Sequence, residues 1–508
     1  MSYNIVWFKR DLRIHDHAPL QQASEKGPVL CLYIIEPSVW LAADTATQHY
    51  QFLCESLLDL DAALRKRGGA LRIEIGEAVQ VLDRLWHEAA FMGLYSHQET
   101  GNWLSFQRDL AVNYWCRTHG LPWHEFAQFG VIRRLKDRAI WQANWEAQMS
   151  APIQPVPAQF NWIAGSNPLT FAEAHTLKLK QLDPPLRQRG GRRQAIQTLS
   201  DFLFDRCARY RGGISSPLQV PTACSRLSAY LSFGCLSLRE VVQATRRQID
   251  TLPPDHPRRA GLTAFISRVY WHCHFIQKLE SQPELEFSNV NPGYDNLRQP
   301  DWNPAYFQAL SAGQTGWPLV DGCIAMLNQT GWLNFRMRAM LVSVASYPLW
   351  LDWQPVGNWL AQQFLDYEPG IHWSQMQMQA GTTGINTPRI YNPIKQAHDH
   401  DPQGHFVRKW LPALRRVPKE WLFQPWQMPE KLQQKCGVKV GVDIAEPLVD
   451  LNLATRIAKA RIYEVRNRDE VKLARAAIVK KHASRKPLNV SPKPKPAATN
   501  WIQTELEF

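Results

Sequence analysis

The sequence predicts an α/β domain built on a parallel sheet, followed by a larger all-α domain. Short apolar runs alternate with amphipathic stretches over residues 1–133, whereas residues 194–483 carry almost wholly helical patterns. Residues 134–193 between them are rich in Pro, Gln and Arg, a composition typical of a connector. Strands that alternate with helices form a parallel sheet. Residues 484–508 form a basic tail that we expect to be disordered.

Four apolar runs predict the strands of the first domain: NIVWF (4–8), VLCLYII (29–35), LRIEI (71–75) and GLYSH (93–97). Helical stretches lie between them, at residues 49–68 and 104–120, and the first of these stops at a Gly pair. A parallel sheet with helices on both faces is Rossmann-like. No GxGxxG or Walker loop accompanies it, so this sheet alone names no ligand.

Composition excludes several classes of protein. The sequence has no run of eighteen apolar residues, so we expect no membrane span, and the first residues lack a secretory signal. Nine cysteines without a CxxC pair predict reduced thiols in a cytoplasmic protein, and neither a disulfide framework, a zinc site nor an iron–sulfur cluster. A formal charge of +13 and a pI near 9.3 favour a polyanionic partner, although the basic tail supplies much of the excess.

The segment PTACSRLSAYLSFGCLS combines hydroxyl groups and a guanidinium at the expected start of a helix. Thr222, Ser225 and Ser228 lie before and within its first turn, and Arg226 lies among them. Free amides at a helix start, hydroxyl donors and a cation together form an anion site. The alternative is an ordinary serine cap.

A second segment, TGWLNFRMRAM, places a cation among apolar residues. If it is helical, Asn334 and Arg338 share one face. A buried guanidinium needs a carboxylate partner, and Asp366 or Glu368 in LDYEPGIHWSQMQMQAGTTG could supply it. The alternative is a surface arginine on an amphipathic helix.

Taken together, these segments resemble the photolyase/cryptochrome flavoproteins from Tyr3 to Trp421. The sharpest matches are SRLSAYLSFGCLS, GWLNFRMR, LDYEPGIHW and RIYNP, in the family's order and spacing. The resemblance implies an antenna domain at residues 1–133, a connector, and a helical domain at 194–483 that holds FAD in a folded form and binds DNA. An antenna chromophore of unknown type could occupy the first domain, where Trp103 and Ser105 do not reproduce the acidic contact of folate-binding members.

The resemblance also assigns the cofactor contacts. Arg338 and Asp366 would pair against the flavin ring, and Glu368 would accept hydrogen bonds from the ribityl chain or the ring edge. His372 would face flavin N5, where photolyases usually carry asparagine, and an imidazole there can donate, accept or titrate. The phosphates and ribityl chain would contact Tyr210, Cys224, Ser225, Arg226, Leu227 and Ser228.

In the photolyase mechanism that the resemblance implies, photoexcited FADH⁻ passes an electron to a cyclobutane pyrimidine dimer that is flipped into a pocket. Trp271 matches the tryptophan against which the dimer packs, and it also adjoins the cofactor. Arg268 stands in place of a lesion-binding glutamate, Phe335 in place of an asparagine and Ala339 in place of a methionine. Further candidates for the pocket or a basic rim, which could equally be solvated surface charges, are Arg336, Arg389 and Lys395.

These departures leave two functions open. The first is a divergent photolyase that acts on damaged DNA, duplex or single-stranded, as a monomer, with little repair of the (6-4) photoproduct because Phe335 and Ala339 stand where that subfamily carries histidines. The second is a cryptochrome-like photoreceptor without repair. A nucleic-acid-binding protein with an empty pocket is disfavoured because the phosphate and ring contacts match together.

Electron supply and metals complete the predictions. Trp353 matches the middle member of the family's tryptophan chain, Trp302 lies near the outermost place, and Met376 takes the proximal place, for which Trp373 could substitute. Each tryptophan could instead fill the core. We expect no metal site, either at His398, His400 and His405 or at His272, Cys273 and His274.

Overall fold

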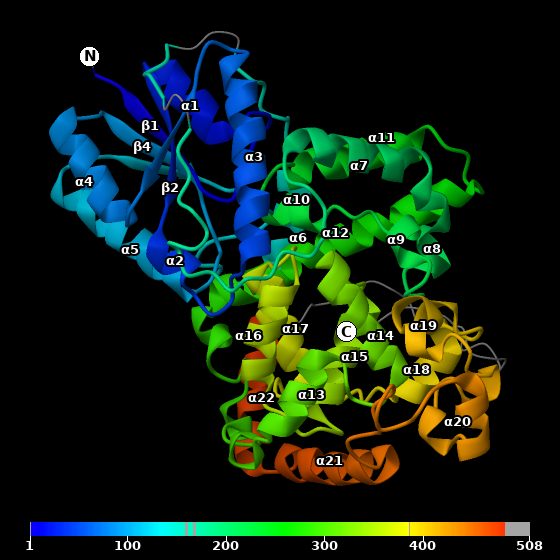
Figure 1. The fold of residues 1–508 in the computed structure, drawn as a ribbon. Helices are drawn as coiled ribbons and strands as arrows, with labels where there is room; N and C mark the ends of the chain where they lie inside the picture. Colours follow the sequence, from blue (N-terminus) through cyan, green and yellow to red (C-terminus); the bar gives the residue numbers. More distant parts are fainter. Residues whose placement is uncertain (1, 158–160, 166–168, 386, 483–508) are drawn as a thin grey trace.

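The computed structural model describes residues 2–157, 161–165, 169–385 and 387–482 (Figure 1). Its N-terminal part holds a five-stranded sheet in which all paired strands are parallel, in the order β3-β2-β1-β4-β5. The strands are β1 (Asn4–Phe8), β2 (Val29–Ile35), β3 (Leu71–Ile75), β4 (Gly93–His97) and β5 (Trp123–Phe126). The four predicted strands have the predicted bounds. The fifth was missed because WHEF is an edge strand that is only partly buried.

Helices cover both faces of this sheet, as predicted. Along β1, Val6 and Phe8 point into one apolar cluster, whereas Ile5 and Trp7 point into another. This alternation is the two-residue period of a strand. The helices are α1 (Ala18–Lys26), α2 (Pro37–Trp40), α3 (Thr47–Arg65), α4 (Ala78–Glu88) and α5 (Trp103–Thr118).

The connector returns to the first domain before the helical domain begins. After η1 (Arg138–Ile140) and α6 (Trp141–Ser150), its backbone bonds to β2, where the Val29 amide donates to Asn161. It then passes the start of α3, where Thr47 and Gln48 donate to carbonyls of residues 180 and 182.

The rest of the described chain is helical. Helices α10 and α11 are separate although their sequence reads as one pattern, because Gly234 between them has φ +67°. The helices are α7 (Arg192–Phe204), α8 (Tyr210–Gly213), α9 (Val220–Ala223), α10 (Ser228–Ser232), α11 (Leu238–Asp250), α12 (Pro257–Ser281), α13 (Pro304–Ala312), α14 (Pro318–Thr330), α15 (Phe335–Ser346), α16 (Trp353–Gln363), α17 (Pro369–Ala380), α18 (Pro393–His400), α19 (His405–Trp410), α20 (Glu430–Cys436), α21 (Leu451–Arg466) and α22 (Asp469–His482).

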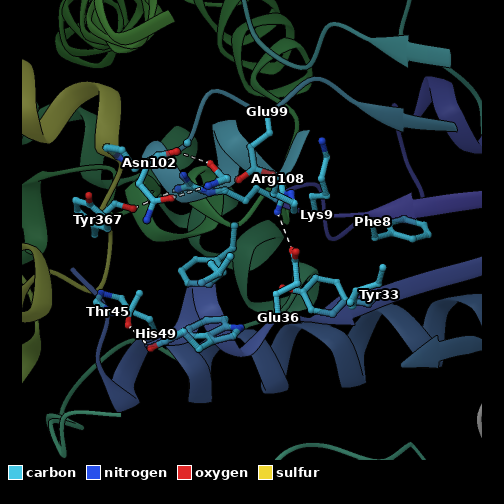
Figure 2. A pocket seen from close by; sticks show the side chains of 18 of the residues that line it. Phe8, Lys9, Tyr33, Glu36, Thr45, His49, Glu99, Asn102, Arg108 and Tyr367 are labelled. Carbon is cyan, nitrogen blue, oxygen red and sulfur yellow. Dashed lines mark hydrogen bonds and ion pairs between the residues drawn. The ribbon is translucent and has the colours of Figure 1, made fainter. Parts of the chain in front are cut away.

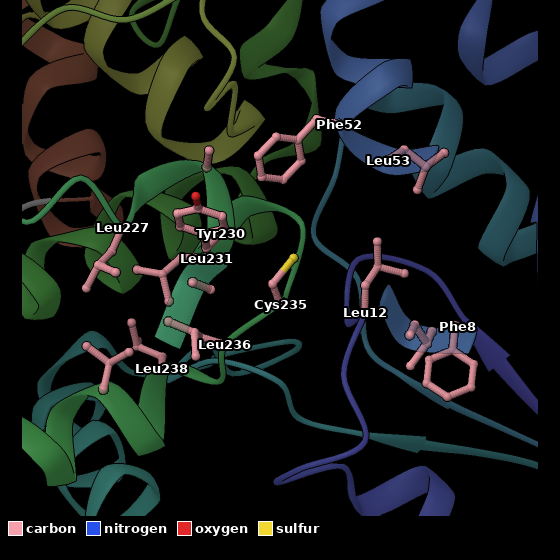
Figure 3. Packing of buried hydrophobic residues seen from close by; sticks show 14 of the residues in the cluster. Phe8, Leu12, Phe52, Leu53, Leu227, Tyr230, Leu231, Cys235, Leu236 and Leu238 are labelled. Carbon is pink, nitrogen blue, oxygen red and sulfur yellow. The ribbon is translucent and has the colours of Figure 1, made fainter. Parts of the chain in front are cut away.

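One apolar cluster joins the two domains. Figure 3 shows Leu12 and Phe52 from the first domain near Tyr230 and Cys235 from the second, and all four are buried. The backbones also touch, since a Cβ at Gly234 would lie 2.1 Å from the Arg10 carbonyl oxygen. The domains therefore pack as one body. Within the described residues, no helix combines the length and apolar character that a bilayer span requires. The expected disordered tail, 484–508, lies outside those residues.

Candidate cofactor site

The turn from Cys224 to Ser228 presents backbone amides in one direction. Arg206 donates to the carbonyls of Cys224 and Ser225, and the Gln188 side chain donates to the Arg226 carbonyl at 3.0 Å. In a trans peptide the N–H points opposite to the C=O, so the amides of residues 225–227 point away from these donors. None of the three has an acceptor among the described residues. The turn thus offers three donors to an anion.

The backbone conformation of Arg226 shapes this turn, and its side chain adds a cation to the turn. Its φ of +59° is unusual for a residue with a side chain. The guanidinium lies 3.8 Å from the centre of the Trp332 ring, and burial lowers its pKa to about 10, so it stays charged at neutral pH. The N-cap of α10 is Leu227, without a side-chain cap, so the serine-cap alternative is wrong. Thr222 is exposed and donates to Gln219, away from the turn.

Arg338 and Asp366 form the ion pair that the sequence predicts. The Arg338 Nη2 atom lies 2.9 Å from both carboxylate oxygens, and Asp366 is buried. The guanidinium also donates from Nε to the Leu333 carbonyl at 2.8 Å and lies 4.0 Å from the Phe364 ring centre. The pair fixes α15 to the segment before α17, and the surface-arginine alternative is wrong.

Glu368 pairs with a residue that the sequence did not indicate. Arg10, which follows β1, donates to Glu368 Oε2 at 2.9 Å and to Ser232 Oγ at 2.6 Å. The second carboxylate oxygen, Oε1, is buried without a hydrogen-bond partner, and burial raises the pKa of Glu368 to about 7. The only sequence signal for Arg10 was a charge directly after a buried strand.

His372 is a neutral imidazole in an aromatic setting. Its Nε2 lies 2.9 Å from the Gly357 carbonyl oxygen and therefore donates to it, which leaves Nδ1 unprotonated. Burial lowers its pKa to about 3, so the imidazole is neutral at neutral pH. The ring packs edge-on against Tyr367 and Trp373, with centroids 5.2 and 4.9 Å away. Nδ1 has no partner in the described part of the chain.

Two of the predicted tryptophans touch. The rings of Trp373 and Trp353 lie 6.0 Å apart at 73°, and Trp353 Nε1 donates to Asn289 at 2.8 Å beside a surface cavity of about 290 Å³. Trp302 instead packs against Phe307, 5.3 Å away, in a separate aromatic group. Met376 is buried in the apolar core.

The predicted lesion residues lie on the helical domain with different exposure. Trp271 is half-buried on α12, and Arg268, three residues earlier on the same face, is exposed and has no ion pair or hydrogen bond within the described chain. Phe335 is 43% exposed, whereas Ala339 is buried. Arg389 is exposed and Arg336 half-buried. Lys395 pairs with Asp399 at 3.0 Å, which favours the surface-charge alternative.

A second cavity, of about 130 Å³, lies where β1, β2 and β4 end (Figure 2). Open parallel sheets bind ligands at this edge, where the strand order reverses. Arg108 is held there by Glu36 at 3.0 Å and Glu99 at 2.6 Å. The walls of this cavity include Ser105, and they extend beyond the first domain to Phe233, Tyr367 and Pro369. A ligand in the cavity would therefore not be confined to residues 1–133.

Asp11, His17 and His97 form the one group of metal-ligand type among the described residues. Both histidines donate to Asp11 Oδ2, at 2.8 and 2.7 Å, and His17 Nδ1 accepts from the Leu20 amide. Each nitrogen that faces Asp11 therefore carries a proton. Hydrogen bonding accounts for this cluster without a cation.

The chemistry of the main site fits a dinucleotide that carries a flavin. At one end, turn amides and Arg226 suit phosphates. At the other end, acceptors without a partner suit N–H and hydroxyl donors: the buried oxygens Glu368 Oε1 and Asn334 Oδ1, and His372 Nδ1. A parallel-sheet domain joined to a helical domain with such a site defines a class of two-domain flavoproteins.

Sequence comparison gives the family. The family model described as the FAD binding domain of DNA photolyase matches residues 265–464, and the model described as DNA photolyase matches residues 4–133. The chain belongs to the photolyase/cryptochrome family.

Individual relatives carry both names. The chain is 27% identical to a cryptochrome DASH of Gloeobacter violaceus, over 88% of this chain and 93% of the relative. It is also 27% identical to a deoxyribodipyrimidine photo-lyase of Streptomyces griseus, over 91% and 99%. A crystal structure of a bacterial class III photolyase from Agrobacterium tumefaciens superposes with a TM-score of 0.79 at 25% identity, over 92% and 98% of the two chains.

Proposed function

We propose that the protein is a divergent photolyase that splits cyclobutane pyrimidine dimers in DNA under blue light. The observation that carries this proposal is the exposed face of α12. Trp271 offers a flat ring, and the unpaired Arg268 beside it offers a cation for phosphate. A flipped base needs an aromatic surface and a backbone contact of this kind.

FAD, when bound, absorbs light and supplies the electron that opens the dimer and takes it back. The Cys224–Ser228 turn, with Tyr210 nearby, holds the phosphates and ribityl chain. The ion pair of Arg338 and Asp366 would lie against the flavin ring, while His372 Nδ1 and Glu368 Oε1 would accept hydrogen bonds from the ring N–H groups or the ribityl hydroxyls. Since the pKa of Glu368 is about 7, Arg10 keeps part of this carboxyl ionised at neutral pH.

Other chain residues serve the substrate and the resting redox state. Phe335, Arg336 and Arg389 line the pocket or its rim, with Lys395 as a weaker candidate. Trp373 and Trp353 carry electrons inward to reduce the cofactor, since their rings touch and Trp353 borders a surface cavity. The cavity of Figure 2 holds an antenna chromophore. With all nine cysteines free, a reducing compartment such as the cytoplasm suits the protein, which we expect to act as a monomer.

The test is repair by the purified, reduced protein of DNA that carries cyclobutane dimers, under blue light. We expect the dimers to disappear, and (6-4) photoproducts to remain. Arg268→Ala should weaken binding to damaged DNA about tenfold. The control Arg209→Ala removes an exposed arginine that is already paired with Asp205, and it should change binding less.

A photoreceptor without repair is the alternative. The changed contacts at Arg268, Phe335 and Ala339 favour it, because a guanidinium cannot accept the hydrogen bonds that a carboxylate accepts. Reversible light-driven bleaching of the flavin with dimers left intact would establish that function and exclude ours.

A further inference from the structure

The junction of the connector, α12 and α22 contains a group of basic side chains without an acid. Arg138 comes from η1, His274 and Lys278 from α12, and His482 from the end of α22. None of the four forms an ion pair within the described chain. The nearest acid in sequence, Asp137, instead caps η1 by accepting from the Ala139 amide at 2.9 Å.

A hydrogen bond joins two of these groups, and electrostatic interactions connect the other two to them. Arg138 Nη2 donates to His274 Nδ1, so His274 is a neutral acceptor, and the guanidinium lies 4.3 Å from the Trp141 ring centre. Burial and, second, the charge of Arg138 lower the pKa of Lys278 to about 8. Burial lowers the pKa of His482 to about 3, and the charges of Lys278 and Arg138 add to that effect. The cations are therefore close enough to repel one another.

His482 occupies an apolar place. On α22 the buried stripe runs from Val471 through Ile478 to His482, which is 2% exposed. Its Nε2 donates to Gln282 Oε1 at 2.8 Å, whereas the buried Nδ1 has no partner. Arg138 Nη1 and Trp141 Nε1 are likewise buried and unpartnered. Such groups each cost free energy unless a ligand satisfies them.

We propose that Arg138, Lys278 and His482 form a binding site for a phosphate group. A guanidinium, a lysine amine, and an imidazole that can gain a proton when an anion arrives match the charge of a phosphate. The half-buried Lys278 and the exposed Lys481 leave the site open to solvent. Trp271, whose ring lies 4.8 Å from that of His274, adjoins it on α12. The phosphate can belong to a free nucleotide or to nucleic acid.

The site is independent of the cofactor contacts and of the proposed repair reaction. Its residues come from the connector, from α22 and, as Lys278, from the C-terminal half of α12, and Trp271 of the lesion face only adjoins it. Flavin content and light-driven flavin reduction should therefore be unchanged when Lys278 is altered, which separates a failure here from a failure of the proposed function.

The test is phosphate binding to the full-length flavin-loaded protein, measured by calorimetry and by thermal unfolding. The ligands are inorganic phosphate, thymidine 5′-monophosphate and an undamaged oligonucleotide. We expect Lys278→Met to weaken binding at least about tenfold and, in phosphate-free buffer, to raise the melting temperature, because it removes a half-buried cation that has no acid partner. The matched control is Lys459→Met, which removes an exposed lysine from α21 and should change neither.

Each outcome of the binding experiment either supports or excludes a phosphate site. Binding of the small phosphates would identify a nucleotide site, and binding of the oligonucleotide alone would identify a nucleic-acid contact. A second variant, His482→Gln, keeps the contact with Gln282 but cannot gain charge, so it should also bind about tenfold more weakly. The proposal is wrong if no ligand binds, or if Lys278→Met and His482→Gln bind as tightly as the parent protein.

Discussion

At the scale of single residues, the site depends on buried charges with incomplete pairing. Asp366 has both oxygens bound by Arg338, whereas Glu368 has one oxygen bound by Arg10 and one without a partner. Burial raises the pKa of a carboxyl that is only partly satisfied. The two acids, two residues apart in sequence, therefore play different parts, one as the ion-pair partner of Arg338 and one as a group that titrates near neutral pH.

Glu368 should make the flavin-free protein less stable as pH rises. The folded protein keeps its proton up to about pH 7, whereas the unfolded chain releases it near pH 4.5. Its favourable contribution is thus complete below pH 4.5 and is lost as pH approaches 7, by on the order of 3 kcal/mol. Glu368→Gln should flatten this part of the melting temperature profile.

The control for this measurement is Glu284→Gln, because Glu284 is an exposed acid. Parent protein and control should lose stability in parallel across this range. A Glu368→Gln profile as steep as that of the parent protein would show that this carboxyl is ionised in the folded state throughout.

At the scale of elements, the sequence was most informative where periodicity and burial coincide. The strands at 4–8, 29–35, 71–75 and 93–97 were predicted to the residue because each is a short apolar run with clear ends. The positions where helices break were harder to predict. The pattern through Gly234 stays apolar, and only the positive φ of this residue ends α10. The packing of the two domains requires the positive φ at Gly234, and a local sequence pattern carries no information about that packing.

Gly234→Ala should destabilise the junction of the domains. The new Cβ would lie 2.1 Å from the Arg10 carbonyl oxygen, in a backbone conformation that already disfavours alanine. Gly212→Ala is a matched control, because Gly212 also has positive φ, +98°, but has nothing within 4 Å of its Cβ position. We expect Gly234→Ala to lower the free energy of unfolding by about 1–3 kcal/mol more than the control does. Equal losses would exclude this close contact.

The aromatic contact between α16 and α17 predicts the route of electrons. Phenylalanine is harder to oxidise than tryptophan, so Trp373→Phe or Trp353→Phe should slow light-driven reduction of bound FAD at least about tenfold. Trp302→Phe should have little effect, because Trp302 contacts Phe307 instead. The rate of flavin reduction is measured by absorbance spectroscopy after timed periods of illumination. A strong effect of Trp302 alone would support the family's more usual chain.

At the scale of the whole molecule, the cofactor site depends on contacts between distant segments. The residues at 222–228 predicted an anion site at a helix start, and the resemblance to the family assigned Asp366 as the partner of Arg338, whereas the residues alone also allowed Glu368. Arg10 could not be predicted, since it crosses from the first domain to Glu368 in the second. The low pKa of His372 and the cations around His482 likewise follow from tertiary burial and not from sequence neighbours.

Flavin content tests the central claim most directly. Asp366→Asn leaves the half-buried Arg338 without its counter-charge, a change that costs about 3–5 kcal/mol. Asp399→Asn breaks the exposed pair with Lys395, which is worth about 0–1 kcal/mol. We predict that the parent protein and Asp399→Asn purify yellow with about one FAD per chain, and that folded Asp366→Asn purifies colourless. Full flavin content in folded Asp366→Asn would contradict the account.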